Sequence, residues 1–331
     1  MNISMNKSKL ILLLSVCMVL LIAGVVLTGC LVTETGKASD YDNATALMED
    51  GRYTEAYEIF KNLGTYHNAS GLMLECQNAI DYNTAIQHMD SSRFQEAKRA
   101  FEALGDFKDS RMMAIECQKG IDYALAMEVM SSKDFAGAKT LFEALIPYKD
   151  SASFATECGN RVIYAKADSA YDDEYFYTAY TLFKSISGFS DSCARADSCV
   201  QDYPATGEIY RSITGTAVSL IFRTPGDDPR PTFLRIYTED NELVSSVFIR
   251  SGDSPTIKLP EGKYYINMAY GENWFGPGDM FGDDAEYQTL QLDRDSETFA
   301  FESNYIYTFR LRTDTYHTDH KDTGNERSNG F

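Results

Sequence analysis

The sequence predicts a multidomain α + β protein, in which an all-α solenoid of helical hairpins is followed by an antiparallel β-sandwich. The helical prediction depends on a ten-residue segment that occurs four times at equal intervals, as FKNLGTYHNA, FEALGDFKDS, FEALIPYKDS and FKSISGFSDS. The β prediction depends on short apolar–polar alternations that begin after Tyr203-Pro204, where the helical spacing stops. A chain of 331 residues has room for two or three domains of about 100–200 residues each.

Residues 1–29 have the pattern of a secretory signal. Two lysines precede an uncharged apolar run from Leu10 to Leu27. The run ends in Leu27-Thr28-Gly29-Cys30, which resembles the lipobox of bacterial lipoproteins: an apolar residue, two small residues and a cysteine. The resemblance implies cleavage before Cys30, diacylglycerol on its thiol and, in many such proteins, an acyl group on the new amine. Membrane lipid is therefore the expected partner of Cys30, and residues 30–40 form the lipidated cysteine and a linker.

Two or more acyl chains anchor a protein stably, since each buried methylene contributes about 0.8 kcal/mol and one chain binds only marginally. An uncleaved signal anchor is the alternative, because the apolar run is nearly long enough to span a bilayer. Both interpretations place the rest of the chain on the extracytoplasmic face of the cell membrane.

Self-similarity extends over four copies of a 41-residue repeat without a gap. The matched positions are Tyr41, Tyr82, Tyr123 and Tyr164; Ala56, Ala97, Ala138 and Ala179; Phe60, Phe101, Phe142 and Phe183; and Cys76, Cys117, Cys158 and Cys199.

Within one copy the apolar spacing is helical. In the second copy, the apolar residues from Phe94 to Leu104 form one stripe of a helix about three turns long. Gly105 is expected to end this helix, because glycine adopts the left-handed backbone conformation found after helix C-termini at the lowest energetic cost. Asp109 is expected to cap the next helix by accepting a hydrogen bond from its first turn, and no breaker follows until about Ser131. Each copy is therefore a hairpin of a short and a long helix, and stacked hairpins bury each other's apolar faces.

The pattern of Tyr, Ala, Phe and Leu across residues 41–202 resembles tetratricopeptide-type repeats, although each copy is longer than their usual length of about 34 residues. The LGDFKDS turn and the trailing cysteine also resemble helical repeats in surface lipoproteins of low-GC Gram-positive bacteria. These resemblances imply an architecture and name no ligand.

The four repeat cysteines are expected to be buried and unpaired. Equivalent positions in stacked helices lie about 10 Å apart, whereas a disulfide needs Cα atoms within about 7 Å. The sequence has no CxxC pair and no Cys-His cluster, so no metal or other cofactor is expected.

Seven to nine short strands are expected in residues 203–312. In KYYINMAY, alternate residues from Tyr264 to Tyr270 share one face, and turns such as Pro260-Glu261-Gly262 separate the runs. This density of strands is typical of an antiparallel sandwich. The segment LPEGKYYI, a Pro-x-Gly-x-Tyr turn leading into a strand, resembles prealbumin-like sandwich modules, and the resemblance covers residues 230–312.

The loop from Gly271 to Tyr287 is the stretch that most looks like a site, and it resembles a Trp-and-Phe-Gly loop in β-domains of bacterial surface lipoproteins. Trp274, the single tryptophan, is a candidate ligand-binding residue together with Phe275 and Phe281. The alternative is that Trp274 and Phe281 fold back as a plug over the end of the sandwich. Nearby carboxylates could hold Ca²⁺ but do not match EF-hand spacing. The polar tail, residues 313–331, is expected to be disordered.

The net charge of −19 argues against a nucleic-acid partner, since phosphate would be repelled. No G-x-S-x-G, HExxH, P-loop or GxGxxG motif occurs, so no catalytic residue is expected. The expected function is a non-enzymatic scaffold that binds a protein or peptide through its helical repeats. One alternative is an envelope enzyme or enzyme accessory that acts on cell-wall glycan through the β-domain. Another is the substrate-binding lipoprotein of a transporter, which would need two α/β lobes, and the sequence has no βαβ pattern.

Overall fold

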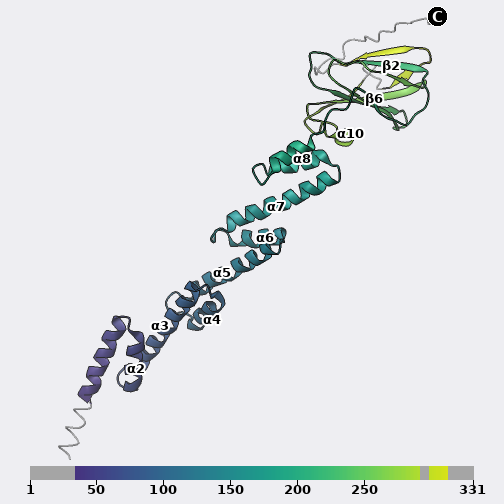
Figure 1. Ribbon diagram of the computed structural model, residues 1–331. Helices are drawn as coiled ribbons and strands as arrows, with labels where there is room; N and C mark the ends of the chain where they lie inside the picture. Colours follow the sequence, from purple (N-terminus) through teal and green to yellow (C-terminus); the bar gives the residue numbers. More distant parts are fainter. Residues whose placement is uncertain (1–33, 291–297, 312–331) are drawn as a thin grey trace, which may run out of the picture. The chain divides into compact units, whose positions relative to one another are not determined.

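The computed structural model describes residues 34–290 and 298–311 (Figure 1). An α-helical N-terminal region is followed by β-sheets that are antiparallel in all but one strand pair, which confirms the α + β class. The predicted signal, Cys30 and the polar tail of residues 313–331 lie outside the described residues.

The chain divides into two compact units, Met1–Ala155 and Thr156–Phe331. This division falls inside a helix, α7 (Ser151–Asp172), rather than at the start of the β region. The last helices therefore belong to the same unit as the sheets, and each unit is described by itself.

The helices alternate in length. Residues 34–49 are helical, and from there a short helix begins at the same position of every repeat. The short helices are α2 (Tyr53–Leu63), α4 (Phe94–Leu104), α6 (Phe135–Leu145) and α8 (Phe176–Ser185). The helices that follow them are α3 (Ala69–Asp90), α5 (Ser110–Ser131), α7 and α9 (Ser192–Cys199). The expected short and long pairing holds except at α9, where the backbone becomes extended at Val200.

Each short helix buries the same small and aromatic pair. The fully buried pairs are Ala56 and Phe60, Ala97 and Phe101, Ala138 and Phe142, and Ala179 and Phe183. Each phenylalanine meets, edge to face, the repeat tyrosine that precedes it in the chain, with ring centroids 5.3–5.8 Å apart. Such pairs contribute about 0.5–1.5 kcal/mol beyond the apolar area they bury, so the matched Tyr and Phe positions of the sequence have a shared packing role.

Two backbone positions with positive φ also recur once in each repeat. One set follows the long helices, with φ of 60–78°, and consists of Gly51, Ser92, Lys133 and Glu174. The other precedes α3, α5, α7 or α9, with φ of 45–52°, and consists of His67, Lys108, Lys149 and Ser190. Glycine occupies a single position in the two sets, so packing of the turn imposes a left-handed conformation that most side chains disfavour.

Lysines in the second set lie over aromatic rings. The Nζ atom of Lys108 is 4.6 Å from the centroid of Tyr82 and 5.5 Å from that of Phe107. The Nζ atom of Lys149 is 5.1 Å from Tyr123 and 5.2 Å from Tyr148. Cation–π attraction to two rings gives a physical reason for lysine at this turn position.

The prediction that the Asp109 side chain caps the helix is wrong, although its position at the helix start is correct. Asp109 does stand at the N-terminal boundary of α5, but its side chain accepts no hydrogen bond from the helix. Its carboxylate instead accepts a hydrogen bond from the Tyr82 hydroxyl, at 2.5 Å, and Tyr164 makes the same bond to Asp191, at 2.6 Å. This Asp therefore ties one helix pair to the preceding helix, which explains why it keeps a constant spacing from a repeat tyrosine.

The described β region contains nine strands, within the predicted range of seven to nine. They are β1 (Gly207–Arg211), β2 (Val218–Arg223), β3 (Thr232–Thr238), β4 (Leu243–Ile249), β5 (Thr256–Leu259), β6 (Gly262–Tyr270), β7 (Glu286–Thr289), β8 (Phe299–Phe301) and β9 (Ile306–Arg310). One sheet has the order β1-β4-β3-β6-β7, with β8 also paired to β6, and the other has the order β5-β2-β9. The pair β2 and β9 is parallel, in contrast to the wholly antiparallel arrangement expected.

One apolar core takes side chains from both sheets. Tyr264, Ile266, Met268 and Tyr270 of β6 all belong to it, which confirms the prediction that they share one face of the strand, and this face is the buried one. The other sheet contributes Val218, Leu220 and Phe222 of β2. The larger sheet turns its other face away from this core. That face, called the outer face below, carries the residues that alternate along the strands with the core residues.

Candidate functional site

The loop predicted as a site connects β6 to β7 and is called the β6–β7 loop. It contains a one-turn helix, α10 (Gly276–Asp279). Its tryptophan packs on the outer face, with the Trp274 ring centroid 4.9 Å from that of Phe248 and 5.1 Å from that of Phe233. Phe281 lies against the same indole, with ring centroids 5.1 Å apart.

Only 2% of the surface of Trp274 is exposed, and Phe281 is equally buried. An indole in this position has no free face on which a sugar or peptide could stack. The loop therefore folds back, as in the alternative interpretation of the sequence, but it covers the outer face of one sheet rather than an end between the two sheets. In this arrangement Trp274 and Phe281 are packing residues.

Phe275 points to a helix rather than to the sheet. Its ring centroid lies 5.1 Å from those of Tyr177 and Tyr180, both on α8. One of the loop carboxylates, Asp279, accepts a hydrogen bond of 3.0 Å from the backbone amide of Tyr177, in the first turn of α8. A side chain 102 residues away thus caps this helix, and Figure 1 shows α10 beside α8.

A backbone hydrogen bond and a glycine also hold the β6–β7 loop against the last helices. The Gln201 amide, just after α9, donates a 2.7 Å hydrogen bond to the carbonyl of Trp274. Gly282 has a φ of +73°, and a Cβ atom there would lie 2.3 Å from the ring of Tyr177. The loop is therefore a structural junction between α8, α9 and the larger sheet, which is a role that the sequence did not predict.

A groove of about 240 Å³ opens on the outer face beside this junction. Its floor is a row of three polar side chains on neighbouring strands, Arg235 of β3, Asn267 of β6 and Thr289 of β7. Tyr237 lines one part of the groove, and its ring is stacked on Tyr265 with a centroid distance of 5.0 Å.

The polar groups of the floor are partly engaged. The Nη2 group of Arg235 donates to the carbonyl oxygens of Pro277 and Gly278 in the β6–β7 loop. The Thr289 hydroxyl donates a 2.9 Å hydrogen bond to the side-chain oxygen of Asn267. Among the described residues, Arg235 has no carboxylate within ion-pair distance.

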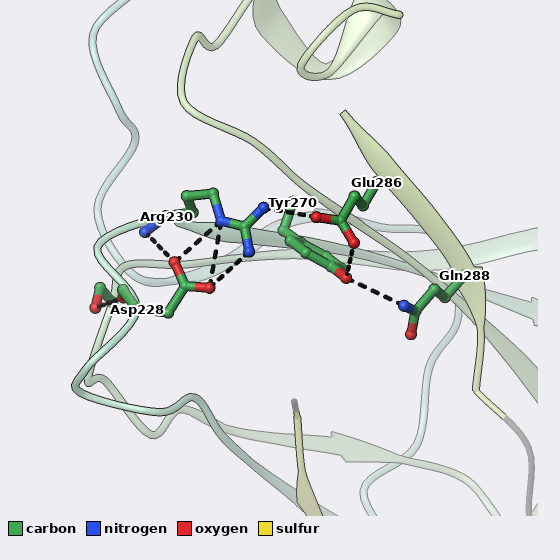
Figure 2. A network of polar contacts seen from close by, with 6 residues as sticks. Asp228, Arg230, Tyr270, Glu286 and Gln288 are labelled. Carbon is green, nitrogen blue, oxygen red and sulfur yellow. Dashed lines mark hydrogen bonds and ion pairs between the residues drawn. The ribbon is translucent and has the colours of Figure 1, made fainter. Parts of the chain in front are cut away.

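A second polar cluster lies where β7 meets the segment before β3. Figure 2 shows the Arg230 guanidinium between two carboxylates, with Nη2 2.8 Å from Oδ2 of Asp228 and Nη1 2.8 Å from Oε1 of Glu286. The Tyr270 hydroxyl donates to the other oxygen of Glu286 at 2.6 Å and accepts from the Gln288 amide at 3.1 Å.

These contacts shift the protonation equilibria of the cluster. The hydrogen bonds from Tyr270 and Arg230 lower the pKa of Glu286 below its usual value, and burial together with the adjacent Glu286 carboxylate raises the pKa of Tyr270. Glu286 is therefore ionised and Tyr270 protonated at neutral pH, and the two side chains are hydrogen-bonded to each other. The cluster is arranged to hold the edge strand rather than to exchange protons with a substrate.

A larger groove lies in the first unit, between α4 and α5. It has a volume of about 660 Å³ and is lined by Lys98, Glu102, Gly105, Arg111, Ala114, Ile115, Gln118 and Lys119. Ile115 has 61% of its surface exposed, and its neighbour on the helix, Met112, has 67% exposed. Leu74, at the repeat position of Ile115 in the preceding copy, is exposed to a similar extent, 60%. Below, this feature is called the α4–α5 groove.

The repeat cysteines have the environment that the sequence predicts. Cys76, Cys117, Cys158 and Cys199 are buried free thiols, whereas Cys193 is exposed. Burial raises the pKa of each buried thiol, in the case of Cys199 to about 11. Such thiols carry little of the thiolate form that reacts or binds a metal.

The described part of the chain contains no cluster of three or more His, Cys, Asp or Glu side chains that could hold a metal ion. Within the same ranges, no helix has the length and apolar character required to span a membrane. Comparison with protein-family models, with curated proteins and with solved structures finds no match to this chain.

The sequence locates the β6–β7 loop but does not give the direction of its rings, because their partners are far away in the chain. The outer-face groove was missed altogether. The available signal was the alternation in β3 and β6, which places Arg235, Tyr237 and Asn267 on the face opposite the core.

Proposed function

We propose that this chain is a lipid-anchored, extracytoplasmic scaffold that binds a protein or peptide partner through its helical repeats and catalyses no reaction. The helices are taken as four copies of a hairpin repeat, and the β region as a sandwich. The recurring helix starts and the recurring positive-φ positions support the four copies. The single core shared by two sheets supports the sandwich.

The observation that carries the binding role is the α4–α5 groove. Exposed apolar patches mark sites of protein association, and Met112 and Ile115, three residues apart on one face of α5, are both exposed. Here Ile115 and Ala114 give the groove an apolar lining, and charged residues such as Lys98, Glu102 and Lys119 line it as well. An apolar centre with a polar rim is the usual anatomy of a protein interface. Leu74, at the same repeat position one copy earlier, is also exposed.

The partner is therefore a protein or peptide that inserts apolar side chains beside Ile115. A nucleic-acid partner is not proposed, because the net charge of −19 would repel phosphate. The alternative of an enzyme accessory for cell-wall glycan has no support from the helical part. It would have to depend on the outer-face groove of the β region.

The binding role can be tested by placing a photo-crosslinking amino acid at position 115 in intact cells of the source organism. A discrete protein adduct is expected there. The same probe at position 125 is a matched control, since Leu125 is also exposed on α5 but does not line the groove. Equal labelling from both positions, or none from position 115, would remove the α4–α5 groove as the binding surface.

The anchoring role is tested separately by Cys30→Ala. Metabolic incorporation of a fatty-acid probe should be lost in this variant, and the protein should leave the membrane fraction. Unchanged labelling would show that Cys30 is not the lipidated residue.

A further inference from the structure

We propose that the outer-face groove of the β region is a binding site for a carboxylate-bearing sugar ring, with Arg235 as its anion-binding residue. This site is separate from the α4–α5 groove and does not depend on the function proposed for it.

Arg235 is held in position and has no acidic partner among the described residues. Its Nη2 group is held by two carbonyl oxygens of the β6–β7 loop, which fixes the orientation of the guanidinium plane. In the described ranges, no hydrogen bond uses its Nε or Nη1 group, and it has no acidic partner although the chain carries a net charge of −19. A guanidinium with free, oriented donors is suited to a carboxylate.

The neighbouring side chains add donors and an aromatic wall. Asn267 uses its side-chain oxygen to accept from Thr289, and within the described ranges no hydrogen bond uses its amide NH₂, which can donate to a ligand. Tyr237 lines the groove, and stacking on Tyr265 holds its ring in place. Directed polar groups beside an aromatic surface are suited to a hydroxylated ring.

A sugar fits this lining better than a peptide does. A peptide that binds by strand addition uses unpaired backbone groups at a sheet edge. Of the described strands that line the groove, β3 and β6 are paired on both sides and only β7 lies at the edge of the sheet. The groove opens on the face of the sheet, whereas the backbone groups of that edge lie in the plane of the sheet. A groove of about 240 Å³ lies below the roughly 300–1,000 Å³ typical of sites for drug-sized ligands, and a single ring suits that size.

The site can be tested with the purified full-length protein and three small probes in an NMR titration. Methyl glucuronide carries the ring and the carboxylate, methyl glucoside carries the same ring without the carboxylate, and N-acetylalanine carries a peptide-type carboxylate without the ring. The glucuronide is expected to bind at least about tenfold more tightly than either control, because only it can use both Arg235 and the aromatic wall.

Two variants assign the contact. Asn267→Asp is isosteric, keeps the acceptor for Thr289 and places a negative charge on the floor of the groove, so it should weaken glucuronide binding at least about tenfold. Arg235→Gln should have a similar effect, and circular dichroism of both variants checks the fold. Failure of the glucuronide to bind, equal binding of the glucoside, tighter binding of N-acetylalanine, or unchanged affinity in Asn267→Asp would each overturn the proposal.

Discussion

At the residue scale, burial distinguishes packing residues from binding residues where the sequence alone fits both roles. A lone tryptophan among glycines and acids is compatible with a binding site or with a plug, because both need a large ring in a loop. The structure places the indole of Trp274 against Phe233 and Phe248, which are cross-strand partners on the outer face. The contacts that distinguish the two cases join residues that are far apart in the chain, and no local pattern encodes them.

Trp274→Ala should lower the free energy of unfolding by about 3–5 kcal/mol, the usual cost of removing a buried large aromatic side chain. Urea denaturation followed by circular dichroism measures this loss. Tyr210→Ala is the control, since Tyr210 is exposed on β1 and should change stability by less than about 0.5 kcal/mol. In the unmodified protein, Trp274 should emit at short wavelength and resist quenching by acrylamide. Ready quenching with no loss of stability in Trp274→Ala would contradict the packing role.

The cysteines give a second test at this scale. Cys193 should react with a thiol reagent within the mixing time, and Cys193→Ser should remove that fast phase. The four repeat cysteines should react slowly, because burial raises the pKa of each thiol, and they should become reactive on denaturation without reductant. If those four thiols stay unreactive after denaturation, they are paired as disulfides and are not packing residues.

At the element scale, the sequence was informative wherever an element is defined by local spacing. The period of the repeat, the helix ends near Leu104 and Ser131, and the shared face of alternate residues in β6 could all be predicted. The bond from Tyr82 to Asp109 could not, because capping explained the same aspartate from local sequence alone. The parallel pairing of β2 with β9 and the cap from Asp279 to α8 also join distant segments.

The junction between α8 and the sheet yields a prediction at this scale. Asp279→Ala removes the acceptor for the Tyr177 amide, and loss of a helix cap of this kind costs about 0.5–2 kcal/mol. Urea denaturation monitored by Trp274 fluorescence should show a lower midpoint. Asp283→Ala, an exposed aspartate in the same loop, is the matched control. A greater loss of stability in the control than in Asp279→Ala would refute the proposed cap.

The polar cluster around Glu286 predicts that the stability of the fold depends on pH. Its pKa is lowered in the folded protein, so it stabilises the fold fully above its ordinary pKa of about 4.5, and this contribution is lost as the pH falls through the lower folded value. Stability measured at a series of pH values should therefore differ between the unmodified protein and Glu286→Gln at neutral pH, with the difference shrinking in acid. Glu242→Gln, at an exposed turn residue, should leave the profile unchanged. A difference that is constant across this range would contradict the assignment.

At the scale of the whole molecule, the two compact units carry different kinds of surface. The first contains the α4–α5 groove, which is lined by apolar and charged side chains. The second joins the last helices to the sheets through the β6–β7 loop and contains the smaller outer-face groove. This division could not be predicted from composition, because the change from helix to strand at Tyr203 lies well after the boundary between the units.

The most direct test of partner binding by the helices is affinity capture from the membrane fraction of source cells with the full-length protein and two matched variants. Ile115→Glu places a charge on the apolar lining of the α4–α5 groove, whereas Leu125→Glu places one on the same helix outside it. We expect the unmodified protein and Leu125→Glu to capture the same partner, and Ile115→Glu, folded by circular dichroism, to lose it. Retention of the partner by Ile115→Glu, or its loss in both variants, would contradict binding through this groove.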